Sequence, residues 1–275
     1  MTQLTIGAAA TVRAPQGETP ADDTTALGYF RDLLVPFGTK PDEDLLRAGT
    51  HVTHQRLADL LADADGVRES RPQLLVVAHA LPDVVPFTAV SPHLTARLGG
   101  EAVNFAIGQQ GLAAPFTALR IAAAYHRAGR AADVVVAVLE QTTLPTRFPL
   151  VHDTPLRDSA AALVLGAGTG SGAGQGLRLE RVATVPTPDD ACAGEGGTRR
   201  TLFVLGPWVA DVAVPGGAAT HRAAPGTYCT SVWLELADHW RQWQDTYRKV
   251  VLCDTDPRDG RTHVAVFTAA GDKGE

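Results

Sequence analysis

The sequence predicts an α/β fold that contains a parallel sheet, and three stretches of the chain carry this prediction. Residues 73–80 and 132–140 are continuous apolar runs, which are typical of strands covered on both faces. Between them, Phe116, Leu119 and Ala123 recur at helical spacing in an apolar segment. Because a strand, a helix and a second strand in this order form a parallel crossover unit, we expect these elements to share one sheet.

Composition indicates a folded protein of one or two lobes. The 275 residues are 45% hydrophobic and 20% charged, with a formal net charge of -6. Because Lys and Arg are scattered along an acidic chain, we expect no nucleic-acid partner. The N-terminal residues lack the basic and apolar regions of a signal peptide, and no stretch is long enough to span a bilayer. We therefore expect a cytoplasmic protein without membrane contact.

The cysteines favour a reducing compartment. Cys192, Cys229 and Cys253 are few, odd in number and far apart, which does not suit a disulfide framework. No two of them are spaced for zinc, and we expect neither a metal nor a cofactor. The glycine pattern at residues 166–176 superficially resembles a dinucleotide loop, but no clear phosphate-binding helix follows, so we reject a nucleotide site.

Residues 169–176 of this Gly-rich stretch are predicted to be a hairpin loop or linker that divides an N-terminal half, 1–168, from a C-terminal half, 177–275. The second half holds one amphipathic helix and an irregular surface loop at 187–200. It also offers four strand-like stretches with a hairpin turn between the last two, at residues 177–185, 201–206, 249–255 and 263–269.

A longer resemblance links these elements. Residues 74–143, followed by RDSAAALVLGAG at 157–168, resemble the N-terminal half of a type III ketoacyl-acyl-carrier-protein synthase (ketosynthase III) of the thiolase superfamily. The resemblance implies a five-layered α-β-α-β-α fold, built from two βαβαβ halves around a buried central helix and usually dimeric. The C-terminal half of this chain looks shortened by comparison.

The resemblance also locates a degenerate catalytic centre. The family's nucleophilic cysteine begins the central helix, in a context that matches Gln109-Gln110-Gly111-Leu112, so Leu112 occupies the nucleophile position. Leucine has no lone pair with which to attack a thioester. The family's histidine and asparagine are likewise replaced, by Gly206-Pro207-Trp208 after one strand and by Thr227 beside the retained Gly226. We therefore do not expect ordinary decarboxylative condensation.

Other residues of the sequence are candidates for altered chemistry. His79, at the end of a strand that the resemblance directs toward the substrate region, and His221, in the predicted loop 217–226, are the first candidates for a general base, ahead of His93 and His152.

Histidines at such positions more often make structural hydrogen bonds. Cys229 is a candidate displaced nucleophile, although a buried free cysteine usually acts as a small hydrophobe. The predicted oxyanion and pocket residues are Gln110, Gly111, Ala113, Phe87, Gly226 and Thr227.

Aromatic residues recur along the C-terminal helix at helical spacing. Trp233, Trp240, Trp243 and Tyr247 predict a buried helix face, part of which can instead be a subunit contact.

Two functions follow, and whether the chain is an enzyme stays open. The first is a degenerate ketosynthase III-like subunit of acyl or polyketide (secondary metabolite) biosynthesis, which pairs with an active ketosynthase and shapes the acyl pocket. The alternative is an acyltransferase, or a condensing or cyclising enzyme, that acts on an acyl thioester by direct transfer with a histidine base. A scaffold without a ligand is the third possibility. The expected partners are acyl-CoA or an acyl-carrier protein, with a second subunit in a homodimer or a heterodimer with a ketosynthase.

Overall fold

The computed structural model describes residues 3–17, 24–166, 176–193, 195 and 199–269. The strands are β1 Thr5–Arg13, β2 Leu74–His79, β3 Val103–Ile107, β4 Val134–Glu140, β5 Ser159–Gly166, β6 Leu177–Val185, β7 Thr201–Leu205, β8 Ala219–Arg222, β9 Lys249–Thr255 and β10 Thr262–Ala269. The helices are α1 Thr24–Leu34, a short 3-10 helix η1 Val35–Phe37, α2 Glu43–Ala48, α3 His54–Asp63, α4 Val90–Arg97, α5 Ala113–Arg127, α6 Pro149–His152, α7 Pro188–Ala193 and α8 Ser231–Thr246.

The two halves of the chain repeat one strand arrangement. In the first half, β2 pairs in parallel with β3 and β4, and β5 runs antiparallel to β4 and β1. In the second half, β7 pairs in parallel with β8 and β9, and β10 runs antiparallel to β9 and β6. The strand order β3-β2-β4-β5-β1-β6-β10-β9-β7-β8 is therefore the same five-stranded pattern used twice, joined where β1 meets β6.

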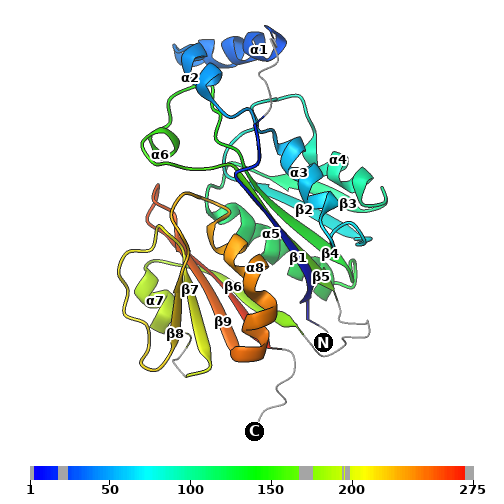
Figure 1. Cartoon of the computed structure of the whole chain (residues 1–275), viewed down its shortest axis with the longest axis vertical. Helices are drawn as coiled ribbons and strands as arrows, with labels where there is room; N and C mark the ends of the chain where they lie inside the picture. Colours follow the sequence, from blue (N-terminus) through cyan, green and yellow to red (C-terminus); the bar gives the residue numbers. More distant parts are fainter. Residues whose placement is uncertain (1–2, 18–23, 167–175, 194, 196–198, 270–275) are drawn as a thin grey trace.

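Helices and sheets alternate in five layers, as the resemblance implied (Figure 1). Helices α3 and α4 pack on the outer face of the first half, and α7 packs on the outer face of the second. Helices α5 and α8 lie between the two halves and contact strands of both. Phe116 of α5 meets Trp233 of α8 edge to face, with ring centroids 4.8 Å apart, inside the largest core cluster. The predicted buried aromatic face of the C-terminal helix is confirmed for Trp233, Trp240 and Trp243, which are all buried. Tyr247 lies one residue past the end of the helix and is half-buried.

The second half is the shorter one, as expected. Helix α4 lies on the connection from β2 to β3, whereas the equivalent connection from β7 to β8, residues 206–218, contains only turns and irregular chain. The first half also carries α1 and α2, which extend from one end of the molecule (Figure 1). The outer layer of the second half is therefore α7 alone among the described helices.

Two sequence predictions need correction. Residues 187–200 were expected to form an irregular loop, but they contain α7, whose first turn is capped where the Asp190 N–H donates to Thr187 Oγ1 at 3.2 Å. Cys192 on this helix is buried against the sheet. The stretch around His221 was also expected to be a loop, but it is the edge strand β8, which pairs with β7.

The predicted Gly-rich linker at 169–176 lies outside the described residues, apart from its last residue, Gly176. Among the described helices, none combines the length and the apolar character needed to cross a bilayer.

Candidate functional site

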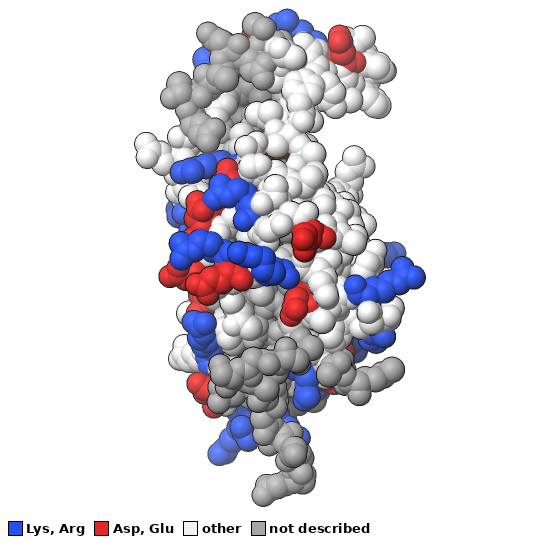
Figure 2. All heavy atoms as spheres, turned by 90° about the vertical axis from the view of Figure 1, so that its right-hand side faces the viewer, with Lys and Arg blue, Asp and Glu red and all other residues white. Residues whose placement is uncertain are grey.

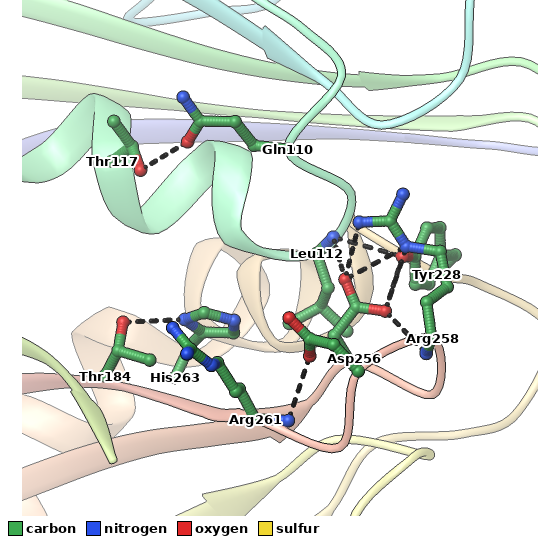
Figure 3. Close-up of polar contacts among 10 residues, drawn as sticks. Gln110, Leu112, Thr117, Thr184, Tyr228, Asp256, Arg258, Arg261 and His263 are labelled. Atoms are coloured by element: carbon green, nitrogen blue, oxygen red, sulfur yellow. Dashed lines mark hydrogen bonds and ion pairs between the residues drawn. The ribbon is translucent and has the colours of Figure 1, made fainter. Parts of the chain in front are cut away.

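A tight turn between β3 and α5 leads the chain into the central helix. Gln109 and Gly111 both have positive φ angles, 60° and 55°. The side chain of Gln110 points back along the helix, where its Oε1 accepts a hydrogen bond from Thr117 Oγ1 at 2.7 Å (Figure 3). Leu112 follows the turn and is 1% exposed, so its side chain is part of the core rather than the wall of an open site.

The N-terminus of α5 is occupied by a carboxylate of the chain itself. The Leu112 N–H donates to Asp256 Oδ2 at 3.1 Å and lies 3.3 Å from the Tyr228 hydroxyl oxygen. That hydroxyl donates to Asp256 Oδ1 at 2.9 Å, and Arg258 Nη2 pairs with Oδ2 at 2.9 Å (Figure 3). Helix N-termini bind anions, because their N–H groups are unpaired and the helix dipole is positive there. Asp256 fills this site from the hairpin between β9 and β10.

Electrostatics keep that carboxylate charged. Burial alone would raise the pKa of Asp256, but the hydrogen bonds from Arg258 outweigh it and hold the pKa below its usual value. Burial, followed by the neighbouring Asp256 charge, raises the pKa of Tyr228, so the phenol stays protonated and remains a donor. The Asp256 carboxylate, which accepts the hydrogen bond from the Leu112 N–H, is therefore ionised at neutral pH.

Gly111 allows this arrangement. A Cβ atom at this position would overlap the guanidinium of Arg258 and the carboxylate of Asp256. Its φ of 55° also lies in the left-handed region that glycine adopts without strain. The next N–H groups of the helix are used internally, since Ala113 N donates to the Gln110 carbonyl and Ala114 N to the Gly111 carbonyl. The expected oxyanion residues Gln110, Gly111 and Ala113 thus lie together at a helix end whose Leu112 N–H is already paired.

A second buried carboxylate, Glu140 of the first half, binds the N-terminus of α8. Glu140, at the end of β4, is fully buried and accepts hydrogen bonds from the N–H groups of Tyr228, Cys229 and Thr230, just before α8 begins. Strands β4 and β9 occupy equivalent places in the two halves. Glu140 at the end of β4 binds the N-terminus of α8, and Asp256 just after β9 binds the N-terminus of α5. Burial raises the pKa of Glu140 to about 7 despite these donors.

Residues from the three stretches that the sequence analysis compared with the family's catalytic positions lie close together. Leu112 contacts Tyr228, whose ring lies 6.0 Å from the Trp208 ring, and Trp208 Nε1 donates to the Thr227 carbonyl at 3.0 Å. Leu112, Trp208 and Thr227, one from each of the three stretches that the resemblance singled out, are thus linked through Tyr228 in one cluster. Gly226 of the same loop has a φ of 111° and its carbonyl accepts from the Arg157 N–H.

His79 lies beside the turn that leads into α5. It ends β2, and a Cβ atom on Gly108, in the turn before α5, would touch its ring. Its Nδ1 lies 2.9 Å from the Leu81 carbonyl, which can only accept, so Nδ1 carries the proton and Nε2 keeps a lone pair. Burial lowers the pKa of His79 and therefore keeps it neutral. Buried His54 packs beside it, with ring centroids 4.8 Å apart.

The other candidates lie elsewhere. His221 on β8 is 2.6 Å from Glu235 Oε2, one turn into α8 rather than at its start. Cys229 is 1% exposed, its Sγ lies 3.6 Å from the Leu139 carbonyl oxygen, and burial and then Glu140 raise the pKa of its thiol, which opposes thiolate chemistry. Phe87 is 55% exposed and packs on Tyr29, 5.3 Å between centroids.

His93 and His152 also have structural partners. His93 Nε2 lies 2.9 Å from Asp59 Oδ1, and His152 Nδ1 bonds with the backbone of Phe148.

Sequence reasoning missed the residues that fill the site. Asp256 and Arg258 were not singled out, because 254–262 was interpreted only as a turn, and Tyr228 and Glu140 were not considered as site residues. Two signals were available in the sequence: Asp256 and Arg258 lie two residues apart inside that turn, and Glu140 is the one acidic residue of the otherwise apolar run 134–140.

Comparisons with known proteins bear on the fold. No protein-family model matches the sequence, and no curated protein matches it. Among solved structures, the tetronic acid condensing enzyme AbyA1 matches at a TM-score of 0.60 and 18% identity, over 97% of this chain and 100% of that one.

Two further structures have the same fold. The 3-oxoacyl-(acyl carrier protein) synthase III FabH from Pseudomonas aeruginosa matches at 0.59 and 15% identity, over 99% and 100% of the chains. A structure of OleA from Xanthomonas campestris with cerulenin matches at 0.60 and 12%, over 97% and 96%. The chain therefore has the thiolase fold in the form that the ketosynthase III-like condensing enzymes share.

Proposed function

We propose that this chain is a non-nucleophilic, ketosynthase III-like subunit of acyl or polyketide biosynthesis that pairs with an active ketosynthase and shapes the acyl pocket. One observation carries the proposal. The helix end at which this fold would activate a nucleophile presents a buried leucine, and the Leu112 N–H is bound to Asp256. An acyl thioester would find neither an attacking atom nor a free donor at that point.

The internal carboxylate makes this helix end a poor site for chemistry through a tetrahedral oxyanion. Such an oxyanion would approach an ionised Asp256, and like charges at close range disfavour each other. To accept the oxyanion, the Leu112 N–H would first have to release Asp256, which Arg258 and Tyr228 also hold. The arrangement instead stabilises the contact between the two halves of the fold.

The edge strand β3 is the surface that we assign to the second subunit. It ends the sheet, and its residues Val103 and Ala106 are exposed, with Val103 at 56%. A strand edge with unpaired backbone groups can continue the sheet into another chain. On the face that α4 and β3 present, charges of both signs gather along one side, beside a largely uncharged surface (Figure 2). Such a surface suits a subunit of the same fold.

The test combines assembly with turnover. The purified chain should form no acyl adduct and no product from acyl-CoA or acyl-carrier thioesters. Mixed with a catalytically complete ketosynthase III-type enzyme from the same organism, the chain should form a heterodimer in light-scattering chromatography, and Val103→Lys should weaken that heterodimer. A stable homodimer that turns over acyl thioesters unaided would refute the proposal.

A second function, direct acyl transfer, is favoured by His79. Its neutral ring, with a free lone pair on Nε2 beside the turn before α5, has the properties of a general base for an incoming amine, alcohol or carbon nucleophile. If the chain has this function, it should form product without a covalent adduct. Product formation should be lost in His79→Ala and retained in the matched control His152→Ala. His221→Ala tests the other predicted base in the same assay. No loss of rate in either His79→Ala or His221→Ala would eliminate both bases.

A further inference from the structure

Three metal-ligating side chains meet on the second half of the molecule, away from the helix N-termini. His221 comes from β8, and Glu235 and His239 lie four residues apart on α8. One ligand atom from each lies within 4.8 Å of the other two. His221 Nε2 is 2.6 Å from Glu235 Oε2, and His239 Nε2 is 3.8 Å from the same oxygen. The spacing of the cysteines led to the expectation of no metal, but these three ligands come from two elements that only the fold brings together.

We propose that His221, Glu235 and His239 form a binding site for a divalent transition-metal ion, and that the ion is Zn²⁺. Two imidazoles with one carboxylate are a donor set that zinc prefers, and calcium and magnesium do not. Bonds of about 2.0–2.2 Å in a tetrahedron place neighbouring ligand atoms roughly 3.3–3.5 Å apart. The 3.8 Å between Glu235 Oε2 and His239 Nε2 is already close to this separation. The 2.6 Å between Glu235 Oε2 and His221 Nε2 would have to lengthen by less than about 1 Å.

The surroundings hold the three ligands in place. Arg13 Nη2 lies 3.3 Å from Glu235 Oε1, whereas both histidines approach the other carboxylate oxygen, Oε2, which is left for the ion. Arg13 also pairs with Asp238 at 2.7 Å, which fixes the guanidinium from a second side. The Trp243 ring packs against both imidazoles, with centroids 5.4 Å from His221 and 5.3 Å from His239.

Partial exposure leaves room for a fourth ligand. The His221 and His239 side chains are 33% and 39% exposed, whereas Glu235 is 13% exposed. An ion bound to the three would therefore have one position open to water. Because β8 is a four-residue edge strand that pairs only with β7 among the described strands, the ion would fasten this edge to the central helix α8.

The test is a calorimetric titration of the full chain, without a histidine tag, with Zn²⁺ as the probe. The expected result is one ion per chain, binding at least tenfold weaker in His221→Asn and in His239→Asn, and no binding in the double variant. His152→Asn is the matched control and should bind like the wild type. Zinc should raise the Tm of the wild type but not of the double variant, because only the former binds it.

Two controls separate loss of the site from loss of the fold. The variants must match the wild type in circular dichroism and Tm without zinc. Cu²⁺ should quench tryptophan fluorescence in the wild type, and Trp243→Phe should remove much of this quenching. Absence of zinc binding by the wild type, or unchanged binding by a folded double variant, would overturn the proposal.

Discussion

Replacing Asp256 with alanine should lower the free energy of unfolding by about 3 kcal/mol. The substitution removes the acceptor shared by the Leu112 N–H, the Tyr228 hydroxyl and the Arg258 guanidinium. Leu112 and Tyr228 are each 1% exposed, so water cannot replace the lost acceptor without entering the core.

The magnitude follows from the exposure of each partner. Leaving a buried donor unpaired costs about 1–3 kcal/mol. The Tyr228 hydroxyl loses its acceptor outright, whereas the Leu112 N–H keeps only its longer hydrogen bond to the Tyr228 oxygen, at 3.3 Å. The Arg258 side chain is 40% exposed, so solvent screens its ion pair with Asp256 and the charge itself contributes roughly 1 kcal/mol or less. Asp256→Asn keeps one acceptor oxygen and should therefore cost only about half as much as Asp256→Ala.

Urea denaturation followed by tryptophan fluorescence measures these differences by linear extrapolation. Asp259→Ala is the matched control, because Asp259 is an exposed residue of the same hairpin. Its carboxylate accepts a hydrogen bond from the Arg261 N–H at 2.9 Å, so this variant should lose about 0.5–1 kcal/mol. The reasoning would be refuted if Asp256→Ala were as stable as the Asp259→Ala control.

Two further substitutions test buried carboxylates. Burial raises the pKa of Glu140 from 4.5 to about 7, so the folded state holds a proton that the unfolded state releases, and stability falls as pH rises through this range. Glu140→Gln should make that decline shallower by about 3 kcal/mol in total, measured by urea denaturation at several pH values; an unchanged slope would contradict it. Gly206→Ala should destabilise the fold by about 1–3 kcal/mol, because the added Cβ would overlap the buried Asp254 carboxylate. The control Gly216→Ala adds its Cβ to open space, and equal Tm values for the two variants would contradict the overlap.

The sequence predicted those elements of the fold whose signals are local. Strands β2 and β4 and helix α5 follow from apolar runs and helical spacing that a short window contains. Helix α7 was missed because it has only six residues and precedes a Gly-rich stretch. Strand β8 was missed because its four residues become a strand only through pairing with β7.

The sequence predicted where the candidate site lies along the chain, but not which side chains fill it. The resemblance placed Leu112 at the start of the central helix, which the fold confirms. The partner of its N–H, Asp256, lies 144 residues further along the chain, and no local pattern connects the two. His221 likewise acquires its neighbours Glu235 and His239 only when β8 packs beside α8. Contacts of this kind depend on the assembled fold rather than on propensity.

Intact-mass spectrometry after incubation with a panel of acyl-CoA and acyl-carrier thioesters, with free product assayed in parallel, tests the central claim most directly. The account predicts no adduct and no product for the wild type, and no adduct for Leu112→Cys, because the neighbouring Asp256 charge raises the pKa of a thiol at that position. The double variant Leu112→Cys, Asp256→Asn should be acylated more readily than Leu112→Cys alone. An adduct on the wild type that Cys229→Ala abolishes, or multiple-turnover product from the wild type alone, would contradict the account.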